Sequence, residues 1–269
     1  RSSDLPALNI HSAGFWCFVI LMVFVFAIVL SFRSVWKSGH VSFGKKGLDI
    51  QKGTMGPYRY LFYLGGVLLL IFLIGSVLSS PIINAKKYQK LMQVEERDFT
   101  ADIKEVDFNT IPLLDRDSAA ILGSRKMGSM VDMVSQFEVA DDYTQINVSG
   151  KPVRVTPLMY ASPIKWLTNQ KNGIPAYIQI DMTTQDTECV KLTEGIKYSE
   201  SEMFNRYIWR HIRFRYPTYI FADQIFFEID DEGTPYWICP VKKFNIGLFG
   251  GVTVGRVVLC NAITGECTD

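Results

Sequence analysis

The sequence contains few histidines and lacks two motifs that mark common catalytic or metal sites. It contains only 3 histidines in 269 residues, and two of them, His11 and His40, lie beside the apolar segments near the N-terminus. It has no Gly-x-Ser-x-Gly motif, which marks the nucleophile of many hydrolases, and no Cys-x-x-Cys pair, which marks many zinc sites. The remaining histidine, His211, lies in a helical pattern that favours the edge of a core. We therefore predict no catalytic residue, no cofactor and no metal, so the protein is not expected to be an enzyme.

Acidic residues are scarce in the first part of the chain. Residues 1–80 hold seven Lys or Arg and only two acids, Asp4 and Asp49, whereas residues 81–269 hold 21 basic and 25 acidic residues. Neither part is basic enough to predict a nucleic-acid partner. The first residue is Arg rather than Met, so we expect a processed chain or a piece of a longer protein.

Charge is absent altogether from two long apolar runs, residues 12–32 and 60–85. A helix of 21 residues spans about 30 Å, which is the thickness of the hydrocarbon core of a bilayer. Both runs are therefore predicted to be transmembrane helices, and Gly65, Gly66 and Gly75 would let helices approach closely. A cleaved signal peptide is the alternative for the first run, but it lacks a basic leader and a small-x-small cleavage site.

The charges beside these runs predict an orientation in the plasma membrane. Residues 33–59 carry six basic residues, including Lys45 and Lys46, against the single acid Asp49. Short loops rich in Lys and Arg remain in the cytoplasm. Both termini, the short segment 1–11 and everything beyond residue 86 are then expected outside the cytoplasm.

The cysteines fit this topology. Cys17 lies in the first apolar run, and the other four are Cys189, Cys239, Cys260 and Cys267. An even number in an oxidising compartment predicts two disulfides, and four cysteines allow three pairings. We favour Cys260 with Cys267, which flank a tight turn, and Cys189 with Cys239. The alternative, a zinc site, would have only His211 as its histidine.

The predicted fold is two transmembrane α-helices plus an extracytoplasmic α+β domain, in which helices pack on antiparallel meander sheets. Residues 86–98 continue a helical pattern and predict a stalk. Residues 99–197 form a first α+β unit, with a helix capped at Asp115 or Asp117 and another that begins at Ser162-Pro163. Residues 198–269 form a second unit, in which a helix precedes three strands.

Two segments near the C-terminus resemble a known family. Phe226-Phe-Glu-Ile-Asp-Asp-Glu-Gly-Thr-Pro-Tyr-Trp237 precedes Val257-Val-Leu-Cys-Asn-Ala-Ile-Thr-Gly-Glu266. Together they look like a PepSY-type domain over residues 198–269, with Asn261 in place of the usual Asp. The resemblance implies a domain outside the cytoplasm that binds or restrains partners and has no catalytic residues. A diverged second copy in residues 100–197 remains an alternative, although no Thr-Gly-Glu occurs there.

Two surface features are candidate binding sites. Arg206, Arg210 and Arg213 recur at helical spacing in a helix expected over residues 202–214, opposite Phe204, Ile208 and His211, and Arg215 is close by. They predict a basic stripe for an anionic partner, with a solvated helix face as the alternative. The glycine loop 247–251 carries Leu248 and Phe249, which would be an exposed contact tip or docked on the protein.

These observations predict a membrane-anchored, non-enzymatic binding, scaffold or regulatory protein. Its partners would be the lipid bilayer and another membrane or envelope protein. One alternative is part of an envelope hydrolase or transferase whose catalytic portion lies outside this chain. Another is an accessory subunit of a transporter, which is disfavoured because neither apolar run contains an ionisable residue.

Overall fold

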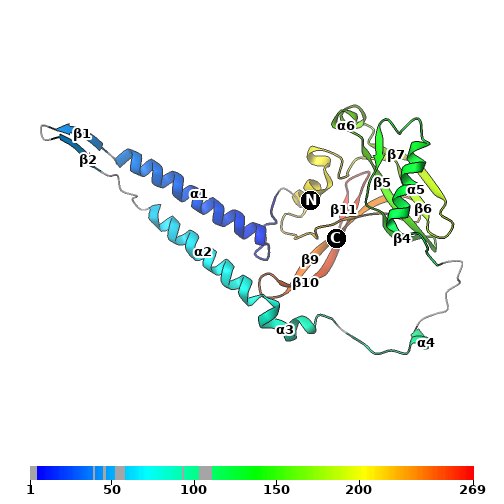
Figure 1. The fold of residues 1–269 in the computed structure, drawn as a ribbon, viewed down its shortest axis with the longest axis horizontal. Coiled ribbons are helices and arrows are strands. Elements are labelled where there is room, and N and C mark those ends of the chain that lie inside the picture. The colour runs from blue at the N-terminus through cyan, green and yellow to red at the C-terminus, as the bar shows by residue number, and fades with distance from the viewer. Residues whose placement is uncertain (1–4, 39, 45–46, 52–57, 93, 103–110) are drawn as a thin grey trace. The chain divides into compact units, whose positions relative to one another are not determined.

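The structure, a computed structural model, describes residues 5–38, 40–44, 47–51, 58–92, 94–102 and 111–269. The chain forms two compact units (Figure 1). A helical unit comprises Pro6–Gln93 and Lys243–Thr253, and a sheet-rich unit comprises Arg1–Leu5, Val94–Lys242 and Val254–Asp269. Lys45 and Lys46, which are predicted to face the cytoplasm, and residues 103–110 of the predicted first α+β unit lie outside the described residues.

The helical unit is built on two long apolar helices, α1 (Ala13–Ser38) and α2 (Arg59–Leu78). They lie side by side (Figure 1), and a Cβ added at Gly65 of α2 would come within 3.0–3.2 Å of the ring of Phe24 of α1. Residues Ala13–Ser34 and Arg59–Leu78 are long and apolar enough to cross a membrane, by length and composition. In the segment of the chain that connects α1 to α2, β1 (His40–Gly44) pairs with β2 (Gly47–Gln51) in antiparallel register.

The second apolar helix ends earlier than its sequence predicts. It stops at Leu78, and a separate helix α3 (Pro81–Gln89) follows, so the predicted continuous helix over residues 60–85 and helical stalk to residue 98 are wrong in their extent. Ser80 between them is extended, with φ −70° and ψ 151°. The proline ring disfavours a helical conformation in the preceding residue, and proline is well suited to the first turn of a new helix. Pro81 therefore starts a helix rather than kinking one.

The first sheet of the sheet-rich unit has five strands. They are β3 (Phe137–Val139), β4 (Thr144–Val148), β5 (Lys151–Tyr160), β6 (Ile174–Asp181) and β7 (Thr187–Ile196). The order is β3-β5-β6-β7, with β4 also paired to β5, and all these pairs are antiparallel. Helix α5 (Arg116–Gly128) packs against β6 and β7, while α6 (Pro163–Asn169) joins β5 to β6; α4 (Phe99–Asp102) is a single turn.

The helix starts in this half follow the predicted chemistry. Asp115 is the N-cap of α5, where its carboxylate accepts from the backbone N–H of Ser118 at 2.8 Å. Ser162 is the N-cap of α6, and Pro163 occupies the first turn. Both caps satisfy backbone donors that a helix leaves open at its N-terminus, and both predictions are confirmed.

The second sheet has four strands in the order β11-β10-β9-β8. They are β8 (Phe226–Ile229), β9 (Pro235–Ile246), β10 (Gly250–Asn261) and β11 (Cys267–Thr268). Before them come a 3-10 turn, η3 (Phe204–Arg206), and the helix α7 (Ile208–Arg215). The antiparallel sheets and accompanying helices confirm an α+β organisation in this part of the chain.

One hydrophobic core joins the two sheets. The inward residues of both belong to a single cluster of buried side chains, in which the rings of Tyr177 (β6) and Phe227 (β8) lie 6.1 Å apart. The turns are also tied together, because the Asp231 carboxylate accepts from the backbone N–H of Ser149 at 2.8 Å. The stretches 99–197 and 198–269 therefore share one core.

Candidate functional site

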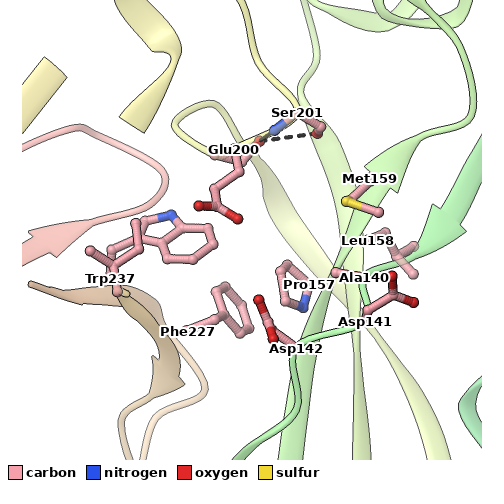
Figure 2. Close-up of a pocket in the computed structure, with 12 residues that line it drawn as sticks. Ala140, Asp141, Asp142, Pro157, Leu158, Met159, Glu200, Ser201, Phe227 and Trp237 are labelled. Atoms are coloured by element: carbon pink, nitrogen blue, oxygen red, sulfur yellow. Dashed lines mark hydrogen bonds between the residues drawn. The ribbon is translucent and has the colours of Figure 1, made fainter. Parts of the chain in front are cut away.

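A partly enclosed cavity of about 200 Å³ lies in the sheet-rich unit (Figure 2). Four stretches of chain line it: residues 140–142, residues 157–159 of β5, residues 199–201, and the strand region of the second sheet that carries Ile225, Phe227 and Trp237. Its walls are apolar and aromatic, and its acids are Asp141, Asp142 and Glu200, all of them exposed.

Hydrogen bonds hold the aromatic wall in place. The indole N–H of Trp237 donates to the carbonyl of Tyr198 at 2.8 Å, and the Phe227 ring packs against the Trp237 ring with centroids 5.4 Å apart. Glu200 accepts from the indole N–H of Trp209 on α7 at 2.6 Å. The wall is thus pre-formed, which reduces the ordering entropy that a ligand must overcome.

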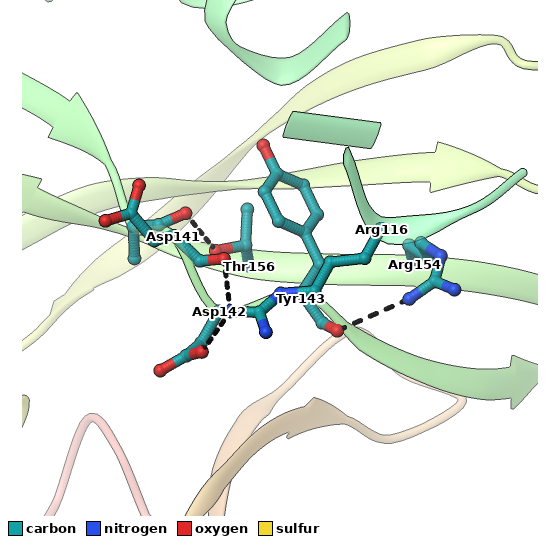
Figure 3. A network of polar contacts seen from close by, with 7 residues as sticks. Arg116, Asp141, Asp142, Tyr143, Arg154 and Thr156 are labelled. Carbon is teal, nitrogen blue, oxygen red and sulfur yellow. Dashed lines mark hydrogen bonds and ion pairs between the residues drawn. The ribbon is translucent and has the colours of Figure 1, made fainter. Parts of the chain in front are cut away.

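A second network fixes the acidic segment (Figure 3). Arg116 donates to the Asp142 carboxylate at 2.6 Å and to the carbonyl of Asp141 at 3.0 Å. Thr156 of β5 donates to the carbonyl of Ala140 at 3.1 Å, and Arg154 donates to the carbonyl of Leu114 at 3.0 Å. The Arg116–Asp142 ion pair is exposed and contributes little stability. Together, however, these hydrogen bonds fix the backbone of residues 140–142 and so the position of Asp141 at the pocket.

The size and chemistry of the pocket limit what it can hold. Sites for small molecules and cofactors usually enclose about 300–1,000 Å³, so a cavity of about 200 Å³ suits one side chain or a small group. Aromatic walls bind the stem of an amphipathic cation, and nearby carboxylates attract its charged end. None of the candidate binding residues or cysteines predicted from the sequence lines this pocket, although Phe227 and Trp237 belong to the segment that resembles a PepSY-type domain.

The predicted arginine stripe is not a single exposed face. Phe204 has φ +53°, a left-handed conformation that a right-handed helix cannot contain, so the helix begins only at Ile208. Arg206 precedes that helix and donates to the carbonyl of Gln170, whereas Arg213 is only 8% exposed.

The buried face of α7 consequently differs from the predicted one. Ile208, Trp209, Ile212 and Arg213 are buried, while Phe204, which was expected in the core, is 71% exposed. Arg213 donates to the carbonyl of Tyr219, and its guanidinium lies 5.6 Å from the centre of the Phe221 ring. Arg210 lies beside the Tyr207 ring, and Arg215 is exposed. The prediction of an exposed face that contains Arg206, Arg210 and Arg213 is therefore wrong.

The Leu248-Phe249 tip is docked within the helical unit. The Ser79 hydroxyl, directly after α2, accepts from the backbone N–H of Leu248 at 2.9 Å and of Phe249 at 3.1 Å. The Phe249 ring packs edge-on against Phe72 of α2, with centroids 5.3 Å apart, and a Cβ added to Gly75 would approach Leu248 within 2.7 Å.

Further bonds complete this joint between the hairpin tip and the helix ends. Tyr88 of α3 donates from its hydroxyl to the carbonyl of Ser79 at 2.8 Å, and the same hydroxyl accepts from the N–H of Gly251 at 3.0 Å. A ring nitrogen of His11 lies 2.7 Å from the carbonyl of Leu248. Of the two alternatives for the tip, the docked one is therefore observed.

The structure shows all five cysteines as free thiols. Cys189 lies on β7 of the first sheet and Cys239 on β9 of the second, so the predicted bridge between them is absent. Cys260 and Cys267 are not bonded either, but they are neighbours on adjacent strands, with their Sγ atoms 2.8 Å apart. Neither of the two predicted disulfides is therefore present in the structure, although Cys260 and Cys267 lie opposite each other.

The sequence did not predict that His211 lies beside Cys260 and Cys267. His211, Cys260 and Cys267 bring their side-chain nitrogen and sulfur atoms within 4.8 Å of one another. His211 lies on α7 and the two cysteines on β10 and β11, so their spacing along the chain does not predict that the three residues form a cluster. Groups of this kind can hold a soft metal ion or form an oxidisable pair.

Comparisons of this chain with models of protein families, with curated proteins and with solved structures gave no match. The resemblance of residues 198–269 to a PepSY-type domain therefore remains a prediction from the residues themselves.

Proposed function

We propose that this chain is a membrane-anchored, non-enzymatic binding or regulatory protein that holds a basic side chain of another membrane or envelope protein in the pocket of Figure 2. The observation that carries the proposal is the combination of a fixed aromatic wall, built by Phe227 and Trp237, with the exposed carboxylates of Asp141 and Glu200. A lysine or arginine side chain matches both, since it has an apolar stem and a charged end.

The anchoring part of the proposal rests on the two apolar helices and their flanking charges. Six basic residues lie in residues 33–59, and loops of this kind remain in the cytoplasm. The sheet-rich unit would then lie outside the cytoplasm. The PepSY-type resemblance supports a binding role there, because such domains bind or restrain partners.

The pocket is tested by site-specific photocrosslinking in native membranes. A photoreactive amino acid in place of Met159, which lines the pocket, should give one discrete crosslinked partner. The same amino acid in place of Leu167, which is 62% exposed on α6, is the matched surface control. Equal crosslinking at both positions would refute a role for the pocket.

Charge reversal tests the chemistry of the occupant. The Asp141→Lys and Glu200→Lys double variant should lose most of the Met159 crosslink, because it places two positive charges where a cation is expected to bind. The Glu188→Lys and Glu194→Lys double variant, an equal change of charge at two exposed positions of β7, should retain it. If the double variant crosslinks as strongly as the wild type, the occupant is not cationic.

The orientation has its own test. Cysteines placed at Lys46 and at Val131, which is 85% exposed in the sheet-rich unit, are exposed to a membrane-impermeant maleimide on intact cells. We expect labelling at position 131 and not at position 46 until the cells are permeabilised. Labelling at position 46 alone would invert the topology.

A further inference from the structure

The Cys260–Cys267 pair stands at a specific place in an antiparallel ladder. Cys260 of β10 and Cys267 of β11 are directly opposite each other, and the turn 261–266 joins them. The N–H of Asn261 donates to the carbonyl of Glu266 at 2.8 Å, so the next pair along is a non-hydrogen-bonded one. Such pairs have Cα atoms about 4.5 Å apart, within the range of about 4.4–6.8 Å that a disulfide spans.

The surroundings favour one of the two sulfurs as the nucleophile. His211 lies beside Cys267, and a ring nitrogen of His211 is held 2.8 Å from the carbonyl of Gly265. The hydrogen bonds of Cys267 with the Cys260 thiol and with His211 lower the pKa of Cys267, and the positive charge of Arg215 acts in the same direction. Cys260 is fully buried, and its hydrogen bond with the Cys267 thiol together with this burial raises the pKa of Cys260.

The same environment separates this pair from the other thiols. Cys239 of β9 also faces the core, where burial raises its pKa, and it is near enough to Cys267 to feel its charge. Cys189 lies on the other sheet, where burial again raises its pKa. A raised pKa leaves little thiolate, which is the reactive form. Only Cys267 combines a stabilised thiolate with a second thiol at 2.8 Å.

We propose that Cys260 and Cys267 are a redox-active pair that closes to a cross-strand disulfide on contact with a small-molecule disulfide, with Cys267 as the attacking sulfur, Cys260 as the resolving sulfur and His211 as a positioning residue. The pair is a modification site distinct from the pocket, and it does not depend on the proposed partner.

The exchange proceeds in two balanced steps. The Cys267 thiolate attacks one sulfur of the external disulfide, whose S–S bond breaks and releases one thiolate with the bonding electrons. Cys260 then attacks the Cys267 sulfur of the mixed disulfide. Its proton leaves with the second small thiol as the Cys260–Cys267 bond forms. The protein dithiol loses two electrons, and the external disulfide gains them.

The geometry distinguishes this pair from a zinc site. With Zn–S bonds of about 2.3 Å at a tetrahedral angle, two sulfur ligands lie about 3.8 Å apart, whereas these sulfurs are 2.8 Å apart. Cysteines directly opposite on adjacent strands are also too near to spread around an ion without moving the ladder. Closure of the bridge would fasten β11, which is only two residues long, to β10.

The test uses the full chain, equilibrated with mixtures of reduced and oxidised glutathione, acid-quenched, alkylated and mapped without reduction. We expect one Cys260–Cys267 bridge under oxidising mixtures, with Cys189 and Cys239 alkylated. A mixed disulfide with glutathione should accumulate at Cys267 in the Cys260→Ser variant and should be absent at Cys260 in the Cys267→Ser variant. Alkylation of all five thiols throughout, or a bridge to another cysteine, would overturn the proposal.

His211 requires a readout that a purely structural role would not change. The initial rate of exchange with oxidised glutathione is followed from pH 5 to 9, and His211→Gln should move the midpoint of the profile upward by about one unit, because the thiolate loses a positive neighbour. Arg215 of α7 and Cys239 of β9 also face the pair and are retained. An unchanged profile would show that His211 has no role in the exchange. If the purified chain holds one equivalent of zinc, and the Cys260→Ser variant holds none, the cluster is a metal site and the redox proposal is wrong.

Discussion

The indole N–H of Trp166 donates to one oxygen of the buried Glu202 carboxyl group at 2.7 Å. The hydroxyl of Tyr160 donates to the other oxygen, also at 2.7 Å, and Glu202 is only 3% exposed. One side chain thus joins the end of β5, the helix α6 and the segment before η3. Both donors would be left buried and unsatisfied without it.

We expect Glu202→Leu to destabilise the chain by about 2–4 kcal/mol, since each buried donor that loses its acceptor costs about 1–3 kcal/mol. The change is measured as the thermal midpoint by near-ultraviolet circular dichroism in detergent. Glu200→Leu is the control, because it replaces a neighbouring, exposed glutamate that accepts only one bond, from Trp209. Equal losses from the two variants would contradict this account.

Gly123 of α5 packs directly under the hydroxyl of Tyr143, where an added Cβ would collide with the phenol oxygen. Among the described residues, that buried oxygen has no hydrogen-bond partner. We therefore expect Gly123→Ala to destabilise by about 1–3 kcal/mol, despite the higher helix propensity of alanine. Tyr143→Phe should restore most of the loss in the double variant, and Gly128→Ala, with open space around it, should be neutral or stabilising.

The same tyrosine makes stability depend on alkaline pH. Burial raises the pKa of Tyr143 from 10.0 to about 12. The folded state therefore retains the phenol proton more tightly than the unfolded state. This contribution is fully present below pH 10 and is lost as the pH rises from about 10 to 12. At pH 11 the loss attributable to Tyr143 is about 1.4 kcal/mol, measured as the excess destabilisation of the wild type over Tyr143→Phe relative to pH 9.

Arg213 is expected to stabilise the fold, although its sequence pattern suggested a surface role. Arg213→Gln should destabilise by about 2–4 kcal/mol, because it removes a charge-assisted bond to the carbonyl of Tyr219 and the contact with the Phe221 ring. Arg215→Gln, two residues along the same helix and exposed, should change the free energy of unfolding by less than about 0.5 kcal/mol. The reverse ranking would place Arg213 at the surface.

Ser79 is expected to control the order of the hairpin tip. Ser79→Ala removes the acceptor for the amides of Leu248 and Phe249, so these amides should exchange roughly five- to thirtyfold faster, as expected for the loss of about 1–2 kcal/mol. Hydrogen exchange read by mass spectrometry measures the change. Ser76→Ala changes a serine in the last turn of α2 whose hydroxyl donates to the carbonyl of Phe72, and it should have no effect at the tip.

Local chemistry predicted the parts of this molecule that depend on neighbours along the chain. The uncharged runs and the caps at Asp115 and Ser162 each follow from composition or capping chemistry over a few residues. The start of α7 could not be obtained in this way. Which side chains of α7 face the core depends on where the helix begins, and the positive φ of Phe204 prevents an earlier start. Nothing in the residue type of Phe204 predicts that φ. Because the helix begins only at Ile208, Arg213 faces the core.

The pocket could not be predicted from the sequence for a related reason. The pocket brings together residues 140–142, 157–159 and 199–201 with Ile225, Phe227 and Trp237, and no short-range rule relates stretches so far apart. The predicted Cys260–Cys267 disulfide is not present, but the tight turn that suggested it does place the two cysteines opposite each other. The pairing of Cys189 with Cys239 failed because it required knowledge of which strands share a sheet.

The joint at the hairpin tip restricts how the sequence can change over evolutionary time. Gly247 and Gly251 have positive φ angles, and Gly250 lies so close to the carbonyl of Ser79 and the hydroxyl of Tyr88 that any side chain would displace the tip. In proteins that descend from a common ancestor with this hairpin, we expect the three glycines to vary together with Ser79 and Tyr88, across more than 150 intervening positions, while exposed strand residues such as Val254 drift independently.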